Sequence, residues 1–136
     1  MGNYEILDHT ADIGVLARGE SLADVFECTT RALADIAGIW RPGPGETVRI
    51  EVESRDAGAL LVDWLSEVLY LQDGRSAAIA GIEMERVEPG VASGTVTLAP
   101  LGPDPVEGVQ IKAVTYHQLV VEREPGGWSA RVFFDI

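Results

Sequence analysis

Three short polar clusters interrupt the regular apolar patterns of this sequence, and each could bind a cation or a proton. The first is the run Asp8-His9-Thr10-Ala11-Asp12, which places two carboxylates, an imidazole and a hydroxyl on a turn between two predicted strands. Carboxylate and other oxygen ligands suit hard cations such as Ca²⁺ and Mg²⁺. The same residue types also stabilise turns by accepting hydrogen bonds from nearby backbone N–H groups. The residues alone leave both interpretations open.

The second cluster is the end of the sequence, Phe133-Phe134-Asp135-Ile136. A strand that continues to the last residue would bring the side chain of Asp135 and the α-carboxylate of Ile136 to the same place. Two carboxylates one residue apart form half of an oxygen shell for Ca²⁺, Mg²⁺ or Mn²⁺. The alternative is an apolar terminal strand that is simply pinned in a sheet.

The third cluster contains Lys112 and His117, within the run from Ile111 to His117. Lys112 is the only lysine among 10 basic residues, which favours a role for a compact ammonium group rather than a planar guanidinium. His117 could bind a metal or carry a proton, but a single histidine in a strand is also commonly structural.

Other catalytic motifs are missing from the sequence. It has no Gly-rich phosphate loop and no serine in a nucleophile elbow. One cysteine and two histidines are too few for the usual structural zinc sites. Cys28 falls near the apolar face of a predicted helix, where we expect a buried, unreactive thiol. We therefore predict no catalytic residue.

Composition limits the kinds of partner. The 136 residues are expected to form one domain, 1–136, and they carry 22 acidic and 10 basic side chains for a net charge of −12. Nucleic-acid binding depends on Lys and Arg side chains that neutralise phosphates, so we expect no direct contact with nucleic acid. We also expect no membrane span, because no apolar run approaches the roughly 20 residues required. A lone cysteine and a start without a secretory signal favour the cytoplasm.

The elements that must position these clusters follow from hydrophobic periodicity and capping residues. Ser21 and Asp56 are predicted N-caps of two helices, which end near Gly38 and at Gln72-Asp73-Gly74. Alternating patterns predict strands at 4–7, 13–17, 47–53, near 77–87, 91–99, 109–123 and 128–135. Short turns between consecutive strands favour an α+β fold with a mixed, largely antiparallel sheet and two packed helices.

Four blocks of the sequence resemble the archease family. They are the run from Tyr4 to Val15, Leu61-Val62-Asp63-Trp64-Leu65 with Tyr70-Leu71, the run from Ile111 to His117, and the closing Phe134-Asp135-Ile136. The resemblance covers the whole chain in order. It implies an α+β fold of the strand–helix–strand–strand type.

The resemblance also implies a function. Archeases assist the RtcB-type RNA ligase in tRNA splicing and RNA repair, by promoting its guanylylation by GTP and its turnover. They hold a metal, assigned as calcium, whose ligands here would be Asp12, Asp135 and Ile136. The same resemblance places Asp8, His9, Lys112 and His117 around that site.

Two other functions remain open at this point. His9, Asp12 and His117 could form the acid/base group of a small metal-dependent hydrolase. Alternatively, the chain could be a chaperone-like binding module in which the metal is purely structural.

Overall fold

The computed structural model describes residues 2–8, 12–103 and 105–136, with the backbone alone for Asp8, and in this part of the chain seven strands and two helices form. In chain order they are β1 (Asn3–Asp8), β2 (Asp12–Gly19), α1 (Leu22–Ala37), β3 (Glu46–Glu53), α2 (Ala57–Gly74), β4 (Ala77–Glu88), β5 (Val91–Pro100), β6 (Ala113–Glu124) and β7 (Gly127–Asp135). The predicted α+β class with two helices is confirmed.

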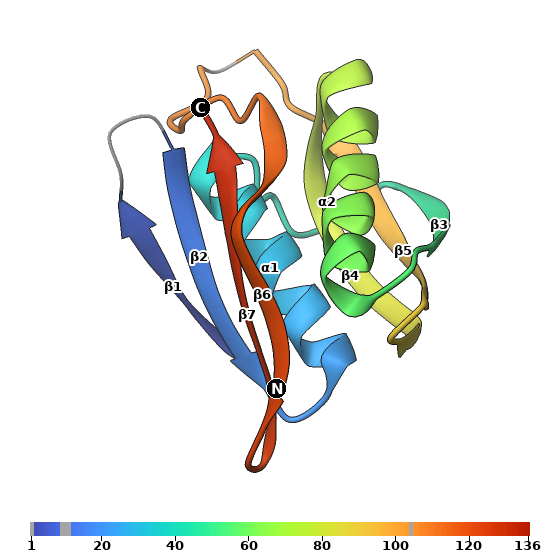
Figure 1. Cartoon of the computed structure of the whole chain (residues 1–136). Coiled ribbons are helices and arrows are strands. Elements are labelled where there is room, and N and C mark those ends of the chain that lie inside the picture. Colours follow the sequence, from blue (N-terminus) through green and yellow to red (C-terminus); the bar gives the residue numbers. More distant parts are fainter. Residues whose placement is uncertain (1, 9–11, 104) are drawn as a thin grey trace.

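The strands are divided between two sheets, a division that the sequence pattern does not indicate. One sheet has four strands in the order β1-β2-β7-β6, and the other has three in the order β3-β5-β4. All the paired strands run antiparallel. Both helices lie between the sheets: α1 packs on β2 and β4, and α2 packs on β6 and on the three-stranded sheet (Figure 1).

Capping side chains set the limits of the helices as predicted. The hydroxyl of Ser21 accepts a hydrogen bond from the N–H of Asp24 at 3.1 Å, and the Asp24 carboxylate accepts one from the N–H of Ser21 at 3.2 Å. Gly38 ends α1 with φ of 72°, a left-handed conformation that glycine adopts without strain. At α2, the Asp56 carboxylate accepts from the N–H of Ala59 at 2.8 Å.

The core between the sheets is centred on Trp64 of α2, which is fully buried. Its indole N–H donates to the hydroxyl of Thr30 on α1 at 2.9 Å, so the buried polar atom of the largest core side chain is satisfied. Within the described residues, neither helix is long and apolar enough to span a membrane.

The predicted strand at 109–123 is partly wrong, because β6 begins only at Ala113. The N–H of Val109 donates to the carbonyl of Ile36 at the end of α1, at 3.0 Å, which takes this segment away from a strand ladder. Residues 101–103 and 105–112 therefore belong to the loop that joins β5 to β6. This loop crosses the ends of both helices before it enters β6 (Figure 1).

Candidate metal centre

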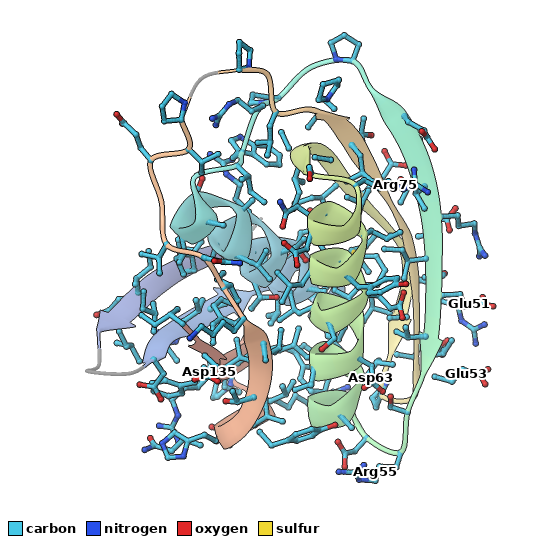
Figure 2. All side chains as sticks on the ribbon, turned by 90° about the horizontal axis from the view of Figure 1, so that it is seen from above. Glu51, Glu53, Arg55, Asp63, Arg75 and Asp135 are labelled. Carbon is cyan, nitrogen blue, oxygen red and sulfur yellow. The ribbon has the colours of Figure 1, made fainter. Side chains whose placement is uncertain are left out.

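Asp12 and Asp135 face each other at one end of the four-stranded sheet. Asp12 opens β2, Asp135 closes β7, and the two are direct partners in the antiparallel ladder. Side chains of directly opposed residues project from the same face, with their Cβ atoms about 5 Å apart. Figure 2 looks down on this end and shows Asp135 there. We call it the carboxylate end: Asp12, Asp135, Ile136 and the loop 101–112.

The two carboxylates differ in their surroundings. The Oδ1 atom of Asp12 is inaccessible to solvent, whereas Asp135 is exposed. The main chain of Asp135 is held from the other side, because its carbonyl accepts a hydrogen bond from the N–H of Lys112 at 2.7 Å. The Lys112 side chain itself is exposed.

An aromatic ring lies beside this pair on the same face of the sheet. Phe133 precedes Asp135 by two residues, so their side chains share a face, and its partner on β2 is Gly14. A Cβ atom at position 14 would lie 2.7 Å from Cε2 of Phe133, so the glycine is what allows the ring to lie across β2. Phe133 is only 6% exposed although it is outside the main core.

A bulge in β6 brings His117 onto that ring. The register between β6 and β7 breaks between Thr115 and Val120, and Gln118 has φ of 50°. The His117 ring meets Phe133 edge-on, with centroids 5.6 Å apart and planes at 69°.

Hydrogen bonds fix the bulge. The N–H of His117 donates to the hydroxyl of Thr115 at 3.3 Å, and Nε of Arg131 donates to the carbonyl of Gln118 at 3.0 Å. A positive φ outside glycine is uncommon and is found where surrounding contacts over-determine the backbone, often at functional sites. Backbone contacts within the sheet therefore fix the position of His117.

The structure thus brings together some of the predicted residues and not others. Asp12 and Asp135 lie opposite each other, the backbone of Lys112 contacts Asp135, and His117 shares their face through Phe133. Asp8 ends β1 with its backbone opposite Ile13. The Asp8 side chain and all of His9 lie outside the part of the chain that the structure describes.

The donors present fit a hard cation. Among the described residues, no three His, Cys, Asp or Glu side chains form a group that could hold a metal ion. Asp12 and Asp135 nevertheless offer carboxylate oxygens on one face, which suit Ca²⁺, Mg²⁺ or Mn²⁺ and not the softer metals.

Comparison with known proteins decides the family. Residues 4–136 match the model of the Archease protein family. The chain belongs to the archease family. The archease of Methanosarcina mazei is 39% identical over 140 residues, which cover 98% of this chain and 95% of that protein. The archease of Thermococcus kodakarensis is 34% identical over 145 residues, with full coverage of both chains.

Solved structures agree with the archease assignment. The solution structure of Methanobacterium thermoautotrophicum protein 1598 superposes with a TM-score of 0.81 at 28% identity, over 98% of both chains. The crystal structure of a Thermotoga maritima protein, described as "an archease, possible chaperone", gives a TM-score of 0.68 at 23% identity, over 97% of this chain and 96% of that one. The second shows the shared fold.

The residues around the carboxylates in this archease chain were not all predicted from its sequence. Gly14 and Phe133 were absent from the candidate residues, as were Thr115 and Arg131. A glycine within a strand pattern signals a close approach of another group, and Gly14 carried that signal. The bulge that aims His117 at Phe133 leaves no comparable trace in the sequence.

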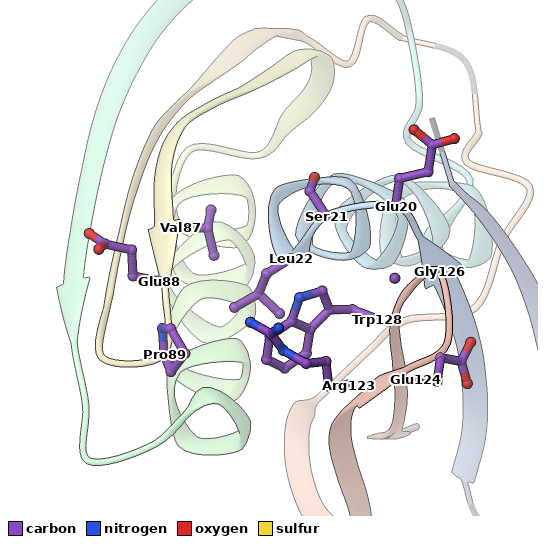
Figure 3. A pocket seen from close by; sticks show the side chains of 11 residues that line it. Glu20, Ser21, Leu22, Val87, Glu88, Pro89, Arg123, Glu124, Gly126 and Trp128 are labelled. Atoms are coloured by element: carbon purple, nitrogen blue, oxygen red, sulfur yellow. The ribbon is translucent and has the colours of Figure 1, made fainter.

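A second concave region lies at the opposite end of the archease fold. We call it the hairpin end: Gly19–Leu22, Val87–Pro89 and Glu124–Trp128. It contains a cavity of about 550 Å³ (Figure 3). The guanidinium of Arg123 covers the ring of Trp128 at 5.2 Å from its centroid, and Arg18 pairs with Glu124 at 3.4 Å. No predicted site residue lies there.

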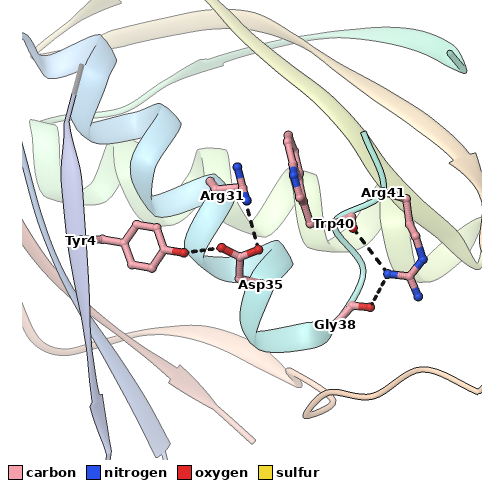
Figure 4. A network of polar contacts seen from close by, with 6 residues as sticks. All are labelled: Tyr4, Arg31, Asp35, Gly38, Trp40 and Arg41. Carbon is pink, nitrogen blue, oxygen red and sulfur yellow. Dashed lines mark hydrogen bonds and ion pairs between the residues drawn. The ribbon is translucent and has the colours of Figure 1, made fainter. Parts of the chain in front are cut away.

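One polar network of the archease chain ties β1 to α1 (Figure 4). The Tyr4 hydroxyl donates to the carboxylate of Asp35, which also accepts from Nε of Arg31 at 3.2 Å. Burial, together with the hydrogen bond to Asp35, raises the pKa of Tyr4 to about 12. The guanidinium carbon of Arg31 in turn lies 4.3 Å from the ring centroid of Trp40. This network holds the first strand in place.

Cys28 of α1 is half-buried under the start of the chain. A Cβ atom at Gly2 would lie 2.7 Å from its sulfur. Burial, and then the nearby carboxylates of Asp24 and Glu27, raise the pKa of the Cys28 thiol. The thiol therefore stays protonated at neutral pH, in agreement with its predicted lack of reactivity.

Proposed function

We propose that this protein is an accessory protein of an RtcB-type RNA ligase in tRNA splicing and RNA repair, where it promotes guanylylation of the ligase by GTP and multiple turnover. Membership of the archease family supports the proposal. The structural observation that carries it is the pair of carboxylates, Asp12 and Asp135, held opposite each other across two strands. Two carboxylates on one face of a sheet offer the oxygen ligands that a hard cation takes.

The cation would be divalent, with calcium as our first choice, and Asp12, Asp135 and the α-carboxylate of Ile136 would hold it. The β2–β7 ladder fixes the first two, and Ile136 directly follows Asp135. When bound, the cation would supply positive charge that offsets these carboxylates. Oxygen ligands of this kind are those that Ca²⁺ prefers.

Lys112 and His117 would act on the ligase side of the site. The backbone of Lys112 contacts Asp135 and its side chain is exposed, so its ammonium group could attract a phosphate group of the nucleotide in the ligase. His117 is exposed and held by the bulge, so it presents a ring in a fixed position. We assign Asp8 and His9 to the same proposed surface because they precede Asp12 by only four and three residues in the sequence.

The partner would be the ligase protein and not the RNA. With a net charge of −12, the chain repels phosphates over most of its surface. We propose no catalytic residue in this chain, and a cytoplasmic location where the single Cys28 stays reduced.

The hydrolase alternative has little structural support. The ring of His117 packs edge-on against Phe133, and its Nε2 lies 3.2 Å from the side-chain amide nitrogen of Gln118, and no described carboxylate contacts the ring to form an acid/base group. Chelation of the metal distinguishes the proposed function from the chaperone-like alternative, in which the metal is purely structural. A purely structural metal predicts that thermal stability and ligase stimulation fall together when the metal is removed.

Multiple-turnover RNA ligation by the cognate ligase tests the proposal. The protein alone should ligate nothing, but it should raise turnover by the ligase in the presence of GTP and a divalent metal. An unchanged rate of turnover over a wide range of added protein would reject the proposed function.

A further inference from the structure

Two valines at the carboxylate end are exposed. In the described part of the chain, the large apolar residues with exposed side chains are Ile6, Tyr70, Val106, Val109 and Tyr116. Val106 and Val109 lie in the loop that leads to β6, beside the last turns of α2, which also carry Tyr70. Tyr116 lies elsewhere, with its ring centroid 6.0 Å from Cζ of Arg55 before the start of α2. Exposed apolar side chains on neighbouring segments mark a contact surface.

A cavity opens in the same region, between the ends of the two helices and beneath the loop 101–112. Its volume is about 330 Å³, enough for one or two inserted side chains. The apolar residues that line it are Ile39, Leu69, Leu101, Val106, Val109 and Ile111. Val106 and Val109 are 39% and 40% exposed, so they stand at its entrance.

The cavity is preformed by backbone contacts. The N–H of Val109 donates to the carbonyl of Ile36 at 3.0 Å, which anchors the loop to the end of α1. Gly108 lies so close to α1 that a Cβ there would be 2.3 Å from the carbonyl carbon of Ala37. On the α2 side, the amide of Gln72 donates to the carbonyl of Ala77 at 3.0 Å. A preformed cavity binds without an ordering cost.

The charges around the cavity select its occupant. Asp73 lines it and is exposed, and Glu107, between the lining residues Val106 and Gly108, is exposed on the loop. A second copy of this chain, with its charge of −12, would be repelled, and so would an RNA backbone. Charge complementarity therefore favours a protein segment with Lys or Arg beside an apolar side chain.

We propose that this cavity, with Val106 and Val109 at its entrance, is a docking site for an apolar side chain flanked by basic residues on the RtcB-type ligase. This inference rests on the proposed function, to which it adds the place where the partner is held. The site is continuous with the metal centre: Ile111 lines the cavity, and the N–H of the next residue, Lys112, donates to the carbonyl of Asp135 at 2.7 Å. A ligase docked here would lie beside the carboxylate pair.

Binding of the purified cognate ligase, measured by calorimetry, tests the site. The double variant Val106→Gln/Val109→Gln keeps the charge but removes the apolar entrance, and should bind the ligase about tenfold more weakly or worse. Val91→Gln is the matched control, because Val91 is a half-buried valine outside the core at the start of β5. It should bind within about twofold of wild type. Asp73→Lys should weaken binding through repulsion of the basic segment.

The outcomes separate the docking site from the proposed function. Wild-type protein that neither binds nor stimulates the ligase would reject both. Stimulation by wild type, with equal binding by the Val106→Gln/Val109→Gln variant, would overturn the docking site alone. Light scattering that shows a wild-type dimer lost in the double variant would assign the cavity to a second copy. Loss of binding to a labelled tRNA half in that variant would assign it to RNA, and either result would overturn the proposal.

Discussion

At the hairpin end of the molecule, one ion pair and one cation–π contact join the strands, whereas at the carboxylate end two carboxylates are placed opposite each other. Arg18 pairs with Glu124, and Arg123 covers the ring of Trp128. Across the same sheet, the ladder sets Asp12 against Asp135. Contacts between opposite charges suit stability of the free protein, whereas the opposed carboxylates suit the cation that we propose for that end.

Replacing one carboxylate of the Asp12/Asp135 pair with a neutral amide should have the largest effect of the changes proposed for these two ends. Asp12→Asn removes one of two acidic side chains from the proposed shell, so metal affinity measured by calorimetry should fall on the order of 100-fold. Glu124→Gln at the hairpin end is the control and should leave metal affinity unchanged. Normal metal binding by Asp12→Asn would remove Asp12 from the site.

An extension after Ile136 tests the third proposed ligand. Extra residues convert the α-carboxylate into a neutral peptide carbonyl, which takes one negative charge from the shell and adds bulk beside it. We expect metal affinity about tenfold lower than that of protein extended at its N-terminus, since hard-cation affinity follows the number of charged ligands. Equal affinities for the two extended proteins would strike Ile136 from the site.

The packing beside the carboxylates can be disturbed without changing any charge. Gly14→Ala would place a Cβ 2.7 Å from the ring of Phe133, so the ring and His117 must move. The free energy of unfolding should fall by about 1–3 kcal/mol in urea titrations. Gly74→Ala is the matched control, because no heavy atom lies within 4 Å of a Cβ there and the residue is helical. It should be neutral or stabilising by up to about 1 kcal/mol. Equal losses in both variants would mean that Gly14 has no special packing role.

The smallest expected effect is on the pH dependence of stability when Tyr4, which contacts Asp35, is replaced. Its pKa is raised from 10.0 to about 12 in the folded protein, so the folded state retains the proton where the unfolded state loses it. The stability that this provides is complete below pH 10 and is lost as the pH rises toward 12. Tyr4→Phe should therefore lose less stability than wild type between pH 9 and pH 12 in denaturant titrations. Parallel curves for the two proteins would contradict the role of the Asp35 contact.

Local signals predicted most of the elements. Ser21 and Asp56 cap the helices where their side chains predicted, and glycine closes α1 at Gly38. Such caps depend on residues within one turn, so the sequence records them directly. The loop before β6 was misjudged because Val109 has strand-like neighbours, while its N–H is bonded to distant Ile36.

The candidate site residues could be named from the sequence, but their geometry could not. Asp12 and Asp135 were chosen for their oxygen ligands and their family blocks, but their opposition depends on the β2–β7 register, a pairing across more than 100 residues. The division of strands between two sheets also depends on long-range packing. Phe133 and the β6 bulge were missed for the same reason, since only the assembled sheet shows that His117 packs on that ring.

The central claim is that the carboxylate end activates an RtcB-type ligase, and guanylylation of the cognate ligase by labelled GTP tests it most directly. The rate should be measured for the ligase alone and with wild type, Asp12→Asn/Asp135→Asn, or Glu124→Gln protein. We predict that wild type and Glu124→Gln accelerate guanylylation equally and that the double variant, although folded, does not. Full acceleration by the double variant would contradict the claim.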